Sequence, residues 1–167
     1  MSKKLLAIAT AAIFSIGIAA GSALASYIAH GRIVLKPTLI AAVLLGAFSL
    51  DLGWATFGRT PGPAPVGVPE MFTSFIGLRM AIDLAGLAVA GGLFIVPSFS
   101  AVQAWAGPDR RARVVAAVNV LNAAFMTVAG IVIGAMQIVG LKPPALVLLV
   151  GVLNLIVALI IHRTMPE

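Results

Sequence analysis

Five long apolar runs dominate the sequence and limit the folds open to it. A helix of about 20 predominantly apolar residues is long enough to cross the hydrocarbon core of a bilayer. The runs predict spanning helices over residues of about 5–29, 38–57, 77–104, 114–139 and 144–161, with short segments rich in Gly, Pro and basic residues between them. We therefore expect an all-α fold, a polytopic membrane helix bundle in which residues 1–167 form one domain.

The composition excludes several classes of protein. Hydrophobic residues make up 61% of the chain and charged residues 10%, and the mean hydropathy is +1.13. An ordinary soluble domain carries about 25% charged residues, and at about 150 residues it still exposes roughly 30% of its chain surface. The sequence is therefore no soluble enzyme, disordered tail or nucleic-acid-binding module, and we expect no nucleic-acid partner despite the net charge of +6. The lack of cysteine excludes disulfides and thiol chemistry.

Basic residues near the span ends predict the orientation in the bilayer, because Lys and Arg are enriched in cytoplasmic loops. One side carries Lys3, Lys4, Arg59 and Lys142, and the other carries Arg32, Lys36, Arg110, Arg111, Arg113 and Arg163. The second side has more basic residues and is expected to be cytoplasmic, with the N-terminus outside and the C-terminus inside. Its three clustered arginines, at 110, 111 and 113, either set this topology or contact anionic headgroups at an inner gate.

The N-terminal run has a second interpretation. Lys3-Lys4, the apolar run and Ala23-Leu24-Ala25 also match a secretory signal with an A-x-A cleavage site, although the run is long for one. Cleavage would leave four spans. A short interfacial helix is expected at 70–75, ahead of the third span.

Three ionisable residues fall inside predicted spans. Asp51 lies late in the second span, and Arg79 and Asp83 lie early in the third, so all three should share one depth toward the outer leaflet. Arg79 and Asp83 are four residues apart on one helix face and can pair directly. Such residues mark either a functional cluster, which gates a pathway or holds a substrate headgroup, or an ion pair that fixes two helices.

Other polar and small residues have packing or functional interpretations. Gln103, Asn119 and Asn122 are expected to line a pathway or to form interhelical hydrogen bonds. Gly91, Gly92 and Pro97 are expected to interrupt the third span and make it flexible, because proline removes a backbone donor. The ridges Gly17-x3-Gly21 and Gly130-x3-Gly134 predict close approach between helices.

The chemistry of the sequence offers no catalytic set. The motifs H-E-x-x-H, G-x-S-x-G and Walker A do not occur, and His30 and His162 lie far apart in the chain. We expect no catalytic residue, no metal and no organic cofactor.

Residues of the third and fourth spans carry a family resemblance. The run Gly91-Gly92-Leu93-Phe94-Ile95-Val96-Pro97 is followed by Gln103, by Arg110-Arg111-Ala112-Arg113, and by Asn119, Asn122-Ala123 and Phe125-Met126. This order resembles the C-terminal half of a major facilitator superfamily carrier of the lysophospholipid-transporter branch, which also occurs fused to an acyl-ACP–phospholipid O-acyltransferase. Val118 departs from the pattern, since that branch has an Asn there.

The resemblance extends to Gly17, Gly21 and Gly31-Arg32, to Ser49-Leu50-Asp51-Leu52, and to Arg163-Thr164-Met165-Pro166-Glu167. It implies helices 8–12 of twelve, an outside N-terminus and a cytoplasmic C-terminus in the inner membrane of a bacterium. It further implies movement of lysophospholipid by alternating access, with the remaining helices supplied by another part of the carrier and an acyltransferase as a possible partner.

Two functions from different classes follow. The first is a part of a lysophospholipid carrier, favoured by the charged residues and the proline in the third span. The second is a non-transporting membrane subunit that anchors or scaffolds a partner such as an acyltransferase, favoured by the small number of spans. A membrane-embedded enzyme lacks support from any catalytic set.

Overall fold

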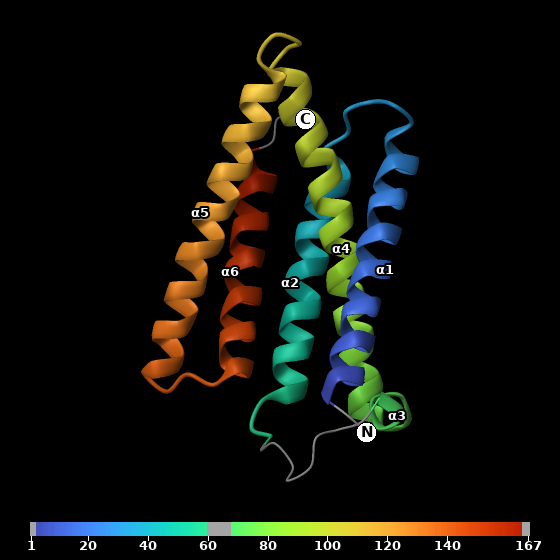
Figure 1. The fold of residues 1–167 in the computed structure, drawn as a ribbon, viewed down its shortest axis with the longest axis vertical. Helices are drawn as coiled ribbons and strands as arrows, with labels where there is room; N and C mark the ends of the chain where they lie inside the picture. The colour runs from blue at the N-terminus through green and yellow to red at the C-terminus, as the bar shows by residue number, and fades with distance from the viewer. Residues whose placement is uncertain (1–2, 60–67, 165–167) are drawn as a thin grey trace.

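A computed structural model describes residues 3–59 and 68–164, and these residues form helices and connecting turns with no strand. Figure 1 shows the helices α1 (Lys3–Ala29), α2 (Lys36–Thr56), α3 (Val68–Thr73), α4 (Phe75–Trp105), α5 (Arg111–Ile138) and α6 (Pro143–Thr164). All of these except α3 are long and apolar enough to cross a membrane. The predicted all-α class and the five long apolar helices are confirmed.

The short helix α3 lies slightly earlier than the sequence suggested. It ends at Thr73, and Phe75 is already the first residue of α4. The cause is local, because the side chain of Ser74 accepts a hydrogen bond from the backbone N–H of Gly77 at 3.0 Å and caps α4. The third long helix therefore begins two residues before the predicted 77.

The long helices pack in a row. The extensive contacts join α1 to α4, α4 to α2 and α2 to α6, and Figure 1 shows the same order across the molecule. α5 stands beside this row with a small contact to α4, and none of its described residues is buried. The loop between α4 and α5, the loop between α1 and α2 and the C-terminal end of α6 lie at one end of the bundle, with α3 at the other (Figure 1).

α4 is continuous through the residues expected to interrupt it. Helix runs from Phe75 to Trp105 with Pro97 buried inside it, so these residues do not divide the span into two helices, and the predicted flexibility stays a prediction. Gly92 instead serves packing, because a Cβ there would collide with the backbone of Ile18 in α1, whereas Gly91 faces open space.

Alanine dominates the buried part of the described chain. Nine of its twelve buried hydrophobic residues are alanines, and no large side chain is fully buried. Leu, Ile, Val and Phe side chains instead point outward in large numbers. A soluble core has the opposite distribution, whereas helices in lipid associate through small residues that bring their backbones close together.

Aromatic residues mark the ends of the long helices. The two tryptophans and the one tyrosine of the chain are all strongly exposed, with Trp54 near the end of α2, Trp105 at the end of α4 and Tyr27 near the end of α1. Trp and Tyr concentrate at the two membrane–water interfaces because their rings are apolar and their N–H or O–H groups are polar. Their positions therefore suit long helices that span a bilayer.

Candidate functional site

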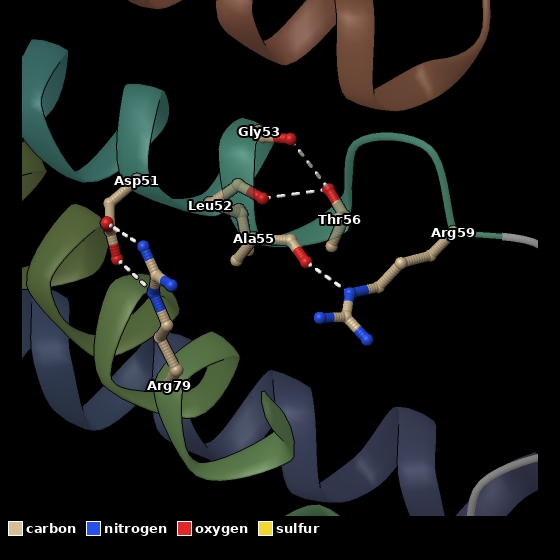
Figure 2. A network of polar contacts seen from close by, with 7 residues as sticks. All are labelled: Asp51, Leu52, Gly53, Ala55, Thr56, Arg59 and Arg79. Carbon is tan, nitrogen blue, oxygen red and sulfur yellow. Dashed lines mark hydrogen bonds and ion pairs between the residues drawn. The ribbon is translucent and has the colours of Figure 1, made fainter. Parts of the chain in front are cut away.

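An ion pair joins α2 to α4. Figure 2 shows the guanidinium of Arg79 facing the carboxylate of Asp51. The Nε–H of Arg79 donates to Oδ2 of Asp51 at 2.8 Å, and Nη2 donates to Oδ1. The side chains remain 33% (Arg79) and 43% (Asp51) exposed. Two parallel hydrogen bonds of this kind fix the orientation of both groups as well as their distance.

Of the two carboxylates open to Arg79, the structure pairs it with Asp51 of the neighbouring helix, as expected for an ion pair that fixes two helices. The planar guanidinium of Arg79 donates to both carboxylate oxygens of Asp51. Two residues that are four apart on one helix form such a two-bond contact less readily. The predicted association of Asp51, Arg79 and Asp83 nevertheless holds in space, since all three line one groove between α2 and α4.

Asp83 is the most deeply placed charged residue of the three. It is 2% exposed, and its Oδ2 atom is buried without a hydrogen-bond partner among the described residues. An ionised carboxylate in this position is costly unless a cation or donor compensates it. This buried oxygen is the chemically least satisfied polar group of the site.

The groove combines this charge with an apolar wall. It has a volume of about 540 Å³ and is lined beyond the three ionisable residues by Phe48, Phe75, Leu78 and Ile82, among others. Phe48 is fixed by close packing, because its ring lies where Gly86 of α4 leaves space. An apolar groove with a few converging polar groups is the usual form of a binding site for a small amphipathic molecule.

The depth of the groove follows from the helix ends. Asp51 lies five residues before the end of α2 and Arg79 four residues after the start of α4, so both are within about 8 Å of a helix end at 1.5 Å per residue. Figure 2 also shows Thr56 and Arg59 closing this end of α2, where Arg59 donates to the carbonyl of Ala55 at 2.8 Å. The ionisable cluster is therefore nearer to one end of the bundle than to its middle.

The other predicted residues lie away from this cluster. Gln103 is half-buried near the far end of α4, and Asn119 and Asn122 are exposed on α5 with no hydrogen bond to the described residues. The three arginines Arg110, Arg111 and Arg113 are exposed at the end of the bundle opposite α3. The structure thus brings the charged residues together and leaves the α5 amides without a partner in the described chain.

Sequence reasoning missed one polar contact between helices. Asn154 of α6 donates a hydrogen bond from its side-chain amide to the carbonyl of Ala42 in α2. The signal was present, because Asn154 is the single amide side chain of α6 and has apolar residues on both sides in the sequence. Buried polar residues in membrane helices usually face a neighbouring helix.

The site lies between two of the five helices that, within residues 3–59 and 68–164, are suited to cross a membrane. The residues that line it all come from α2 and α4. A comparison of the chain with family models, with curated proteins and with solved structures finds no match.

Proposed function

We propose that this chain is part of a membrane transporter that moves lysophospholipid, or a similar amphipathic lipid, by alternating access. The observation that supports it most is the groove between α2 and α4, where three ionisable side chains adjoin an apolar wall. A lysophospholipid has the matching division, with an ionic headgroup and one acyl chain. The resemblance of residues in α4 and α5 to the lysophospholipid-transporter branch agrees with this choice.

The side chains suggest how such a lipid is held. Arg79 is the one cation among the described residues that line the groove, and guanidinium groups bind phosphate through two parallel hydrogen bonds. A phosphate would replace the Asp51 carboxylate at Arg79, and so would loosen the tie between α2 and α4. Phe48, Leu78 and Ile82 would contact the acyl chain. Binding and helix movement are thereby linked at one residue.

The cellular setting of the proposal is the inner membrane of a bacterium, with the N-terminus outside. The greater number of basic residues at the end of the bundle opposite α3 supports this orientation through the positive-inside rule. Lipid delivered to the cytoplasmic face would be re-acylated there by an acyltransferase partner. The remaining helices of the carrier would pack on α5, which the present bundle leaves uncovered.

A second function is favoured by α5 itself. None of its described residues is buried, and Asn119 and Asn122 have no partner in the described chain. Amide side chains in lipid are satisfied by hydrogen bonds to other helices. A subunit that anchors a membrane partner through α5, without transport, would use the same surface.

Uptake of a fluorescent lysophospholipid into native membrane vesicles separates the two functions. Vesicles would come from cells that lack the gene, complemented with the parent chain or with a variant. Under the transport proposal, Arg79→Gln lowers uptake at least about tenfold, the equivalent of about 1.4 kcal/mol of lost binding. The control is Arg163→Gln, an exposed arginine at the end of α6 and outside the groove, with protein levels matched by immunoblot.

Each outcome decides between the functions. Loss of uptake in the deletion strain and in Arg79→Gln, with Arg163→Gln unaffected, supports the carrier. Normal uptake in the deletion strain overturns the carrier. The scaffold is supported if, in addition, an acyltransferase co-purifies with the parent chain and loses its membrane attachment in the deletion strain.

A further inference from the structure

The groove contains a carboxyl group with one buried oxygen that has no hydrogen-bond partner among the described residues. Asp83 is 2% exposed in a helix that is apolar enough to span a bilayer, and its Oδ2 atom is buried with no hydrogen-bond partner among the described residues. An unpaired ionised carboxylate in such surroundings is strongly unfavourable, and the group takes up a proton instead. The structure therefore suits a neutral Asp83.

The cation near Asp83 is shared with a second carboxylate. From α2 it is faced by Asp51, and within α4 by Arg79, whose guanidinium is already committed to Asp51 by two hydrogen bonds. In sequence, α3 contributes Glu70, whose side chain lies outside the described part of the chain. The basic residues of α5 begin at Arg111, at the opposite end of the bundle.

The neighbouring helix α1 adds no close charge. Gly17 of α1 lies against Ala88 of α4, and the two helices run in the same direction, because Gly21 in turn lies against Leu93. Asp83 is thus level with about residue 12 of α1, and Lys4 is about 12 Å away along the helix axis. α1 has no other charged residue beyond Lys3 and Lys4.

We propose that Asp83 is a proton-binding site, and that the binding and release of its proton switch Arg79 between two carboxylates. With Asp83 protonated, Arg79 pairs with Asp51 and ties α4 to α2, as the structure shows. When the O–H bond of Asp83 breaks, its proton passes to water entering the groove and a second carboxylate is created. That carboxylate lies four residues from Arg79 on the same helix, a spacing at which the two can pair, and it competes with Asp51.

A proton fits this site better than a metal ion does. The described residues contain no group of three or more His, Asp or Glu side chains that could hold a metal. Sodium-like or divalent cations need several oxygen ligands at once, whereas the free Oδ2 of Asp83 offers one. A proton needs one oxygen and no additional space.

The switch would couple proton movement to lipid movement, an inference that rests on the proposed transport function. The proton site itself is a property of this chain and can be tested without transport. Release of the proton frees Asp51 from Arg79 at the wall of the groove, and so changes both the charge offered to a headgroup and the contact between α2 and α4.

Infrared difference spectroscopy of the full chain in liposomes measures the proton directly. A protonated carboxylic acid shows a C=O stretching band that disappears on ionisation. We expect one such band to titrate in the parent chain, to be absent in Asp83→Asn at every pH, and to return at a shifted frequency in Asp83→Glu. The controls are Asp109→Asn, an exposed loop carboxyl, and Glu70→Gln.

The same band tests the exchange of Arg79. In Asp51→Asn the guanidinium is free to pair with Asp83 and stabilises its ionised form, so the band should disappear at a lower pH than in the parent. In Arg79→Gln that stabilisation is lost, and the band should persist to a higher pH. An unchanged midpoint in Asp51→Asn overturns the exchange, and a band that survives Asp83→Asn overturns the proton site.

Uptake in native vesicles distinguishes failure of this inference from failure of the transport proposal. If one proton moves with each lipid, one unit of pH gradient changes the equilibrium accumulation about tenfold, and Asp83→Asn removes that dependence. A band assigned to Asp83 without any uptake leaves the proton site standing and refutes transport. Uptake that ignores the pH gradient, with no band assigned to Asp83, leaves transport standing and refutes the inference.

Discussion

The same substitution at two glycines should change stability in opposite directions. Gly21 of α1 lies against α4 so closely that an added Cβ would collide with the carbonyl group of Val89 and reach 3.0 Å from the backbone nitrogen of Leu93. Gly91 of α4 has nothing within 4 Å of the same added atom. Gly21→Ala therefore forces two backbones apart, whereas Gly91→Ala adds a methyl group in open space.

The size of the effect follows from these contacts. Overpacking of a tight contact costs about 1–3 kcal/mol, and the backbone atoms at Gly21 cannot rotate away, so we expect a loss of about 2–3 kcal/mol. An exposed helical Gly→Ala change gains up to about 1 kcal/mol. In detergent the unfolded state keeps much of its helix, so the gain at Gly91 should be a few tenths of a kcal/mol.

Unfolding by sodium dodecyl sulfate in mixed micelles, followed by tryptophan fluorescence, measures both changes. Val89→Ala should not rescue Gly21→Ala, because the colliding atoms belong to the backbone of Val89. At Gly46 the collision is with the side chain of Leu155, so Leu155→Ala should rescue Gly46→Ala. Equal losses at Gly21 and Gly91, or rescue of Gly21→Ala by Val89→Ala, would refute the reasoning.

Two further predictions concern polar contacts and use the same unfolding assay. Asn154→Ala should destabilise the bundle by about 1 kcal/mol, because it removes a hydrogen bond between helices. The matched control Asn122→Ala removes no such bond and should leave the free energy of unfolding unchanged. A similar loss of stability in both variants would contradict the assignment. Arg79→Gln should lower the unfolding midpoint more than Asp51→Asn, because Arg79 can pair with Asp83 when Asp51 is neutral, whereas no other groove-lining residue replaces Arg79. The reverse order would show that Asp83 does not reach Arg79.

Hydropathy predicted the long helices because length and apolarity alone decide whether a helix can span a bilayer. It also placed Asp51, Arg79 and Asp83 at one depth, since depth is counted along the chain. Hydropathy did not decide which of the two carboxylates pairs with Arg79, for a physical reason. Which carboxylate faces the guanidinium depends on the rotation of α2 and α4 about their axes, and hydropathy in a membrane helix carries little information on rotation.

Small residues illustrate the same limit. The ridge of Gly17 and Gly21 does form the predicted close contact, with α4 as its partner. The ridge of Gly130 and Gly134 is similar in sequence, yet nothing lies within 4 Å of either glycine, because α5 stands outside the row of packed helices. A glycine spacing states that a helix can be approached closely and does not state which helix approaches it.

The alanine-filled contacts have a consequence for how this sequence can change over evolutionary time. Where backbones touch through Ala and Gly, almost any larger residue is rejected, whereas Leu, Ile, Val, Met and Phe are interchangeable at positions that face only acyl chains. Selection then acts on a sparse set of small residues, and the bulky majority drifts freely. Descendants of this chain should keep the spacing of their small residues long after the overall identity between them has been lost.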